Sequence, residues 1–354
     1  MIARLTSYMA SFFTRRRPRR NQRPRQHKRP GRRLFLAHSL KLFTAALGLL
    51  AARSVLKPSP ALAISTPLSI QQVADGIYLH VGRHERPSPQ NRGDIANIAF
   101  IVGDERVLVF DSGYAPYLGS SLKAAVASIT DKPIAYVITS HIHPDHIFGN
   151  SALQAPDVTF IGHKDLPTAF KHVGPYYLRG LADNIGTQAA TGAQLVPPSL
   201  LVDLNKPLVL DLGGRSVRIE AWKPAHTHAD VTAFDDKSGV LLTGDLVFVS
   251  HVPTFDGSTL GWIGALKAMR TYQCKGILPG HGKASIGNQW TQPIDAMLTY
   301  LTTVVTDVRA LIARNATIDE AVKQAAQSQK KNWLLFDDYH PGNVTFAFAE
   351  LEWE

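Results

Sequence analysis

Residues 140–150 read SHIHPDHIFGN, a stretch that places three of the chain's 14 histidines within six consecutive positions. It follows directly on the apolar run PIAYVIT (133–139), which is typical of a buried strand. His141 and His143 are two residues apart, so on an extended segment their side chains point the same way. Pro144 then turns the chain, so that Asp145 and His146 can address a neighbouring point. Because imidazole and carboxylate groups are zinc ligands, the pattern indicates two metal ions held close together.

Three further residues occupy the same kind of position, at the end of an apolar run and before a turn. They are His226 in PAHTHAD, Asp245 in LLTGDLVF and His281 in ILPGHG. A single residue of this kind is usually a turn or cap residue. Seven possible ligands at successive strand-to-loop junctions instead favour a metal centre.

Alternating strands, turns and helices predict the architecture. We expect strands at 76–81, 97–103, 106–111, 133–139, 208–222, 239–245 and 276–280, and helices at 118–129, 260–272 and from 291 to about 328. Two β-rich halves, each followed by helices, predict an α+β sandwich of two sheets with helices outside. The absence of a clear linker sequence predicts one domain over 64–354, with a helical and aromatic C-terminal extension from about 291.

The formal charge of +10 is concentrated at the N-terminus. Residues 1–63 hold 15 of the 38 Lys and Arg and no acidic residue, which leaves 23 basic against 28 acidic residues, a net charge of −5. That balance offers no basic surface for nucleic acid. The single cysteine, Cys274, excludes an intrachain disulfide and a thiolate zinc cluster.

Residues 1–63 have the layout of an export signal. A polybasic stretch precedes the apolar run LFTAALGLLAA (42–52), which is too short to span a bilayer, and Ala61-Leu62-Ala63 fits signal peptidase cleavage after Ala63. Arg32-Arg33 resembles a twin-arginine signal. We therefore expect a periplasmic protein with no stable membrane span after cleavage. An uncleaved anchor and a basic disordered arm are the alternatives.

The order of the metal-binding motifs resembles the five-motif pattern of the metallo-β-lactamase superfamily over residues 70–290, and Asp111 in VLVFDSG matches its first motif. The resemblance implies a four-layer αβ/βα sandwich with the site at one edge of the sheets. It assigns one zinc ion to His141, His143 and His226 and the other to Asp145, His146 and His281. It further implies that Asp245 bridges the two ions and that Asp111 orients a ligand.

Two zinc ions that share an oxygen lower the pKa of bound water and leave a zinc-bound hydroxide as nucleophile. Asp145 is the candidate proton acceptor for that bridging water. Such a site cleaves ester, thioester, lactone, lactam or phosphoester bonds of a small-molecule substrate. Four residues are candidates for lining the substrate pocket, namely His228, His251, Asp256 and Trp262. An exposed-loop role is the alternative for His228, and turn or core roles are the alternatives for the other three. The stretch KHVGPYYLRG (171–180) is a candidate lid.

Several shorter phrases resemble the quinoprotein relay system zinc metallohydrolases, which are exported proteins found with pyrroloquinoline quinone (PQQ)-dependent oxidation systems. These phrases include NRGDIANIAFIVG (91–103), HVPTFDGSTLGW (251–262) and FAELEWE (348–354). The resemblance implies a periplasmic quinoprotein dehydrogenase system as partner.

Other functions remain open. One alternative is a metallo-β-lactamase acting on β-lactams, although class B1 enzymes carry Cys where this chain has Asp245. Another is a metal-bearing binding or relay protein without turnover. A flavodiiron-type redox role is a third, but those proteins prefer a carboxylate where this chain has His143.

Overall fold

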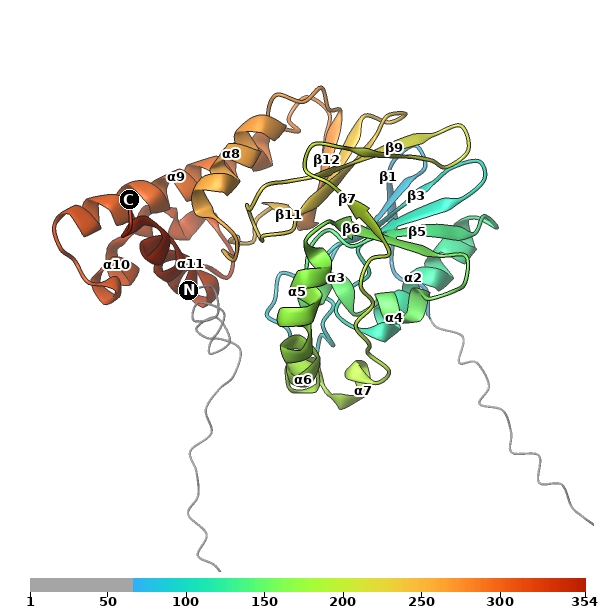
Figure 1. Ribbon diagram of the computed structural model, residues 1–354, viewed down its shortest axis with the longest axis horizontal. Coiled ribbons are helices and arrows are strands. Elements are labelled where there is room, and N and C mark those ends of the chain that lie inside the picture. The colour runs from blue at the N-terminus through green and yellow to red at the C-terminus, as the bar shows by residue number, and fades with distance from the viewer. Residues whose placement is uncertain (1–65) are drawn as a thin grey trace, which may run out of the picture. The chain divides into compact units, whose positions relative to one another are not determined.

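The computed structural model describes residues 66–354, so the expected export signal at 1–63 lies outside the described residues. Two stacked β-sheets form the middle of the described part, and helices cover their outer faces (Figure 1). The predicted four-layer αβ/βα sandwich is thereby confirmed.

The first sheet has seven strands in the order of the sequence. They are β1 (Gln71–Ala74), β2 (Ile77–His80), β3 (Ile98–Val102), β4 (Val107–Phe110), β5 (Ile134–Ile138), β6 (Thr159–His163) and β7 (Leu200–Val202). Strands β1 to β4 pair antiparallel, whereas β4 to β7 pair parallel. The carboxyl ends of β4, β5 and β6 therefore meet at one edge of the sheet.

The second sheet has six strands in the order β13-β12-β11-β10-β9-β8. They are β8 (Leu208–Asp211), β9 (Ser216–Ala221), β10 (Val231–Asp235), β11 (Val240–Phe248), β12 (Gly276–His281) and β13 (Ser285–Ile286). Only β11 and β12 pair parallel. This parallel pair brings the ends of the strands that carry Asp245 and His281 together.

Helices fall into two groups along the chain (Figure 1). The first group lies between successive strands of the first sheet, from β4 to β7: α2 (Pro116–Ile129), α3 (Pro144–Ile147), α4 (Asn150–Leu153), α5 (Leu166–His172), α6 (Gly174–Ile185) and α7 (Thr187–Ala190). The second group begins with α8 (Thr259–Met269), which lies between β11 and β12. The others follow β13: α9 (Gln292–Ala313), α10 (Ile318–Gln324), the 3₁₀ helix η1 (Gln327–Asn332) and α11 (Phe336–Leu351).

Alternation along the strands explains the layers. In β3, Ile98 and Phe100 pack with residues of the first helix group, whereas Ala99 and Ile101 pack against the second sheet. All four side chains are buried, so both faces of this central strand face a core. A third core lies between the second sheet and the helices α8, α9 and α11.

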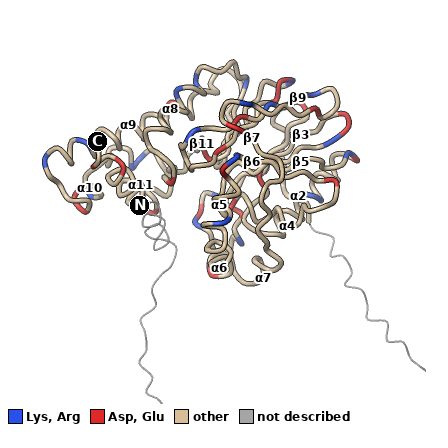
Figure 2. The backbone as a smooth tube through the Cα atoms, in the orientation of Figure 1, with Lys and Arg blue, Asp and Glu red and all other residues tan. Residues whose placement is uncertain are grey.

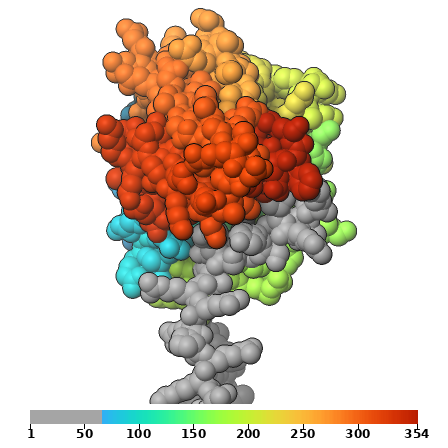
Figure 3. Space-filling view, turned by 90° about the vertical axis from the view of Figure 1, so that its left-hand side faces the viewer, coloured from blue at the N-terminus to red at the C-terminus, as the bar shows by residue number. Residues whose placement is uncertain are grey.

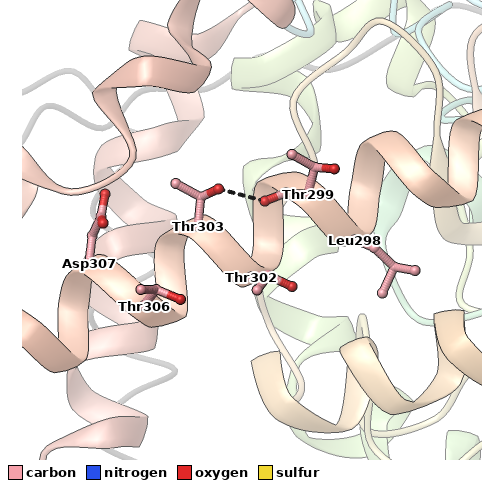
Figure 4. Close-up of a pocket in the computed structure, with 6 residues that line it drawn as sticks. All are labelled: Leu298, Thr299, Thr302, Thr303, Thr306 and Asp307. Atoms are coloured by element: carbon pink, nitrogen blue, oxygen red, sulfur yellow. Dashed lines mark hydrogen bonds between the residues drawn. The ribbon is translucent and has the colours of Figure 1, made fainter.

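Helix α9 is amphipathic, and its length and apolar composition are sufficient to cross a membrane. In this fold its apolar side, including Met297, Leu301 and Val304, is buried in the third core. Its opposite side holds a hollow of about 440 Å³ (Figure 4), lined by Leu298, Thr299, Thr302, Thr303, Thr306 and Asp307. The C-terminal helices, drawn in orange to red, lie together on the side shown in Figure 3. Helix α9 is thus a core helix with a threonine-rich outer side.

One prediction about these helices is wrong in detail. The helical pattern from 291 to about 328 is interrupted after α9, where Asn315 adopts a left-handed conformation with φ 57°. Thr317 and Glu320 then form a capping box that starts α10.

Lys and Arg are interspersed with Asp and Glu along the described residues (Figure 2).

Candidate metal centre

All seven predicted ligands converge at one edge of the two sheets. His141 follows β5, His143 is the N-cap of α3, and Asp145 and His146 belong to α3 itself. The other three come from the second half, where His226 lies between β9 and β10, Asp245 lies in β11 and His281 ends β12. The site therefore joins two halves of the chain.

The seven side chains divide into two groups, each with its possible ligand atoms within 4.8 Å of one another. The first group holds His141, His143, His226 and Asp245, and the second holds Asp145, His146 and His281. This division matches the one that the sequence resemblance implies.

Asp245 reaches both groups. Its Oδ2 lies 3.5 Å from His226 Nε2 and 3.7 Å from His141 Nε2 in the first group. The same oxygen lies 3.4 Å from His281 Nε2, and Oδ1 lies 3.2 Å from His146 Nε2, both in the second group. A Cβ on Gly280 would lie 1.8 Å from Asp245 Oδ1, so glycine is required at this position for the carboxylate to lie here.

In each of the five histidines of the two groups, the ring nitrogen that points away from the centre contacts a neighbouring oxygen. These oxygens are Ser140 Oγ for His141 (2.8 Å), Asp256 Oδ2 for His143 (3.1 Å), Asp111 Oδ2 for His146 (2.8 Å), Thr254 O for His226 (2.9 Å) and Ile95 O for His281 (2.9 Å). Each contact fixes the ring and directs its remaining nitrogen toward the centre. Asp111 thus has the orienting position that the sequence resemblance implies.

The residues present fit a pair of metal ions. His141 Nε2, His146 Nε2 and Asp245 Oδ1 are buried and have no hydrogen-bond partner among the described residues. His226 Nε2 and His143 Nδ1 face each other at 3.0 Å. When both rings are neutral and donate through their other nitrogens, two lone pairs meet there, which a shared cation would stabilise.

Electrostatics favour positive charge in the second group. Burial alone would lower the pKa of His281, but the carboxylates of Asp245 and Asp145 outweigh it and raise the pKa to about 9. Asp145 shows the reverse effect: burial would raise its pKa, but His146 and His281 lower it to about 2. In the first group, burial and the neighbouring His143 lower the pKa of His226 to about 3. Binding of a divalent cation in the second group would therefore displace the proton of His281.

Solvent reaches the centre from one side. The side chains of His143 and Asp145 are 16% and 13% exposed, whereas those of His146 and His226 are fully buried. A substrate would therefore approach along His143 and Asp145.

The four candidate pocket residues have different positions. His228 is exposed in the loop after His226. Asp256 contacts His143 and is 29% exposed, so it lies at the rim of the site. His251 is buried, with its ring centroid 5.2 Å from that of His281.

Trp262 has the core role, one of its two alternatives, and does not line an open pocket. It is fully buried, donates to Leu246 O at 2.9 Å and packs its ring 5.0 Å from that of His226. Its bulky ring packs in the third core beside His226.

Three tyrosines lie near Asp145, and of these the sequence marked Tyr177 alone, as part of the candidate lid. Burial and the charge of Asp145 raise the pKa of Tyr114 and of Tyr339, and burial with the charges of Asp256 and Asp145 raises that of Tyr177. Tyr177 lies in α6, so the expected lid is helical. Tyr114 and Tyr339 come from distant segments, and no local motif marks them.

Comparisons with known proteins agree with this geometry. Residues 91–281, more than half of the chain, match the family model described as Metallo-beta-lactamase superfamily, and this range contains all seven possible ligands. No curated protein matches the chain significantly.

Two solved structures illustrate the shared fold. A metallo-beta-lactamase from Pontibacter korlensis aligns with TM-score 0.53 and 14% identity, covering 66% of this chain and 99% of that one. The sec-alkylsulfatase Pisa1 from Pseudomonas sp. aligns with TM-score 0.64 and 15% identity, covering 80% of this chain and 50% of the sulfatase. This chain therefore spans about half the length of the sulfatase.

Proposed function

The chain belongs to the metallo-β-lactamase superfamily, and on this premise we propose that it is an exported binuclear zinc hydrolase linked to a periplasmic quinoprotein oxidation system. The observation that carries the hydrolase proposal is the convergence of seven ligand side chains in two groups that share Asp245. The export and quinoprotein parts rest on the sequence phrases at 1–63, 91–103, 251–262 and 348–354.

In this proposal, His141, His143 and His226 would hold one ion, Asp145, His146 and His281 the other, and Asp245 both. When bound, two zinc ions would supply an activated water and a Lewis acid for the scissile group. Asp145 lies at the open side, where its carboxylate would accept the proton of the attacking water. Asp256 and Asp111 hold the rings of His143 and His146 in place.

The bond type is tested with a substrate panel. The purified chain, reconstituted with Zn²⁺, is assayed on a thioester, a lactone, a β-lactam, a phosphodiester and an alkyl ester, with a chelator-treated sample as control. An alkyl sulfate belongs in the panel because the aligned Pisa1 is an alkylsulfatase. We expect chelator-sensitive turnover of a carboxylic ester, thioester or lactone. Turnover of the β-lactam alone would favour the lactamase alternative.

Absence of turnover across the whole panel, with two zinc ions bound, would favour a binding or relay role instead.

Export has a separate test, because replacing Arg32 and Arg33 by lysine should leave the protein in the cytoplasm. Periplasmic accumulation of that variant would contradict the twin-arginine route.

A further inference from the structure

The C-terminal helix α11 lies outside the range that matches the family, yet it contacts the loop that supports two ligands. This loop, residues 253–258, follows β11 and leads into α8. Helix α11 contacts it at two points. Asn343 forms hydrogen bonds with the first half of the loop, at Pro253 and Phe255. At the end of the loop, Glu350 accepts hydrogen bonds from Ser258 Oγ (2.7 Å) and Thr259 N (2.8 Å).

Asn343 holds the loop backbone through both ends of its amide. Its Nδ2 donates to Pro253 O at 2.6 Å, and its Oδ1 accepts from Phe255 N at 3.1 Å. Asn343 is only 2% exposed, so these bonds do not compete with bulk water. The residue that Asn343 brackets, Thr254, is therefore fixed from both sides.

Thr254 and Asp256 carry this order to the metal centre. Thr254 O accepts from His226 Nδ1 at 2.9 Å, which fixes the tautomer that leaves Nε2 free to bind metal. Asp256 N donates to His226 O at 3.1 Å, and its carboxylate contacts His143 Nε2 at 3.1 Å. Two of the three histidines in the first group thus depend on this loop.

Asn343 itself is fixed by a buried network. Its second Nδ2 hydrogen bond goes to Tyr300 Oη at 2.9 Å. Because His340 Nε2 donates to Ala325 O at 2.9 Å, its Nδ1 is free to accept from Tyr300 Oη at 2.8 Å. The Asn343 Nδ2 and Oδ1 atoms therefore both have hydrogen-bond partners of the matching kind. As a result, the Asn343 amide has one orientation.

We propose that Asn343 is a positioning residue for the metal centre, which acts through Thr254 on His226 and through Asp256 on His143. The proposal rests on the proposed metal-binding role of these histidines. It assigns a functional task to the C-terminal extension. Without the Asn343 amide, the loop would still connect β11 to α8, but it would lose the two hydrogen bonds that orient the Thr254 carbonyl.

The test compares Asn343→Ala with Val344→Ala in the full chain. Val344 is the next residue of α11 and is fully buried, so its truncation loosens the same helix without removing a polar contact. Zn²⁺ affinity and stoichiometry are measured by competition with a chromophoric chelator, and urea unfolding reports stability. Asn343→Ser provides a second variant if the alanine variant does not fold, because its short hydroxyl cannot span both backbone groups.

We expect Asn343→Ala and Asn343→Ser to weaken one of the two zinc-binding steps by about tenfold or more. The other step, and both steps in Val344→Ala, should stay unchanged. Equal losses in Asn343→Ala and Val344→Ala would overturn the positioning role and leave the metal centre standing. A wild-type chain that binds no zinc would overturn the proposed function, and the role of Asn343 with it.

Discussion

Replacing Asp111 by asparagine tests how strongly the orienting contacts control metal binding. Asp111 Oδ2 accepts from His146 Nδ1 (2.8 Å) and from Ser140 Oγ (2.7 Å), and Oδ1 accepts from Ser140 N (2.8 Å). Ser140 Oγ in turn contacts His141 Nδ1 at 2.8 Å. One carboxylate therefore supports a ligand in each group. Asparagine keeps its shape and tolerates the left-handed backbone (φ 61°) found there.

The magnitude follows from these contacts. In the variant, the amide NH₂ would face His146 Nδ1, so the ring would lose its acceptor and its preference for the metal-binding tautomer. A hydrogen bond to a charged group contributes about 1.5–3 kcal/mol. Loss of such a contact behind a metal ligand lowers affinity about 10- to 100-fold, or about 1.4–2.7 kcal/mol. The two ranges agree, and we expect the larger loss at the ion held by His146.

Zn²⁺ competition with a chelator measures the effect, and circular dichroism verifies that the variant is folded. The matched control is Asp131→Asn, because the Asp131 side chain is 90% exposed and forms an ion pair with the neighbouring Lys132. The control should bind two ions as the wild type does. If Asp111→Asn also bound two ions with affinities within about threefold of the wild type, the orienting role of Asp111 would be refuted, since about tenfold is the smallest loss expected.

Three further predictions concern other parts of the fold. Asp245→Ala should reduce bound zinc from two ions toward one while the fold is kept, and elemental analysis showing two ions would rule out the shared ligand. Burial would lower the pKa of His80, but Asp94 and the Ser69 carbonyl outweigh it and raise the pKa. The contribution of His80 to stability is therefore full below about pH 6.5 and is lost as the pH rises through its folded pKa. His80→Asn should therefore lower the free energy of unfolding by urea more at about pH 6 than at about pH 9. An equal cost at both pH values would contradict this. Ser258→Ala removes the N-cap of α8 and should cost about 1 kcal/mol in the same assay, and an unchanged unfolding midpoint would argue against it.

Elements with a strong local pattern were predictable from the sequence. The expected strand at 276–280 is β12 (Gly276–His281), and the expected helix at 118–129 is α2 (Pro116–Ile129). Strands β1 (Gln71–Ala74) and β10 (Val231–Asp235) escaped prediction. β1 lacks a strong apolar alternation, and VTAFD is short and mixed, so neither differs from a loop at the level of sequence.

The ligand positions were predictable because each follows an apolar run, but their supports were not. Thr254 and Ile95 act through backbone carbonyls, which leave no mark in the sequence. Asn343 lies far along the chain from the ligands that it supports. The sequence could not decide between a pocket and a core role for Trp262, because its packing in the core depends on the neighbouring helices.

The division of the ligands between two halves has a consequence for the order in which the chain is made. Residues 141–146 leave the ribosome well before His281, so a growing chain carries three histidines and an aspartate without their partners. Such a half-site would have little geometric selectivity, and copper would outcompete zinc for it. Geometric discrimination among metals would then require the second sheet to dock, because it supplies His226, Asp245 and His281. The metal that occupies the proposed centre would therefore depend on when and where the chain completes its folding, as well as on the ligands themselves.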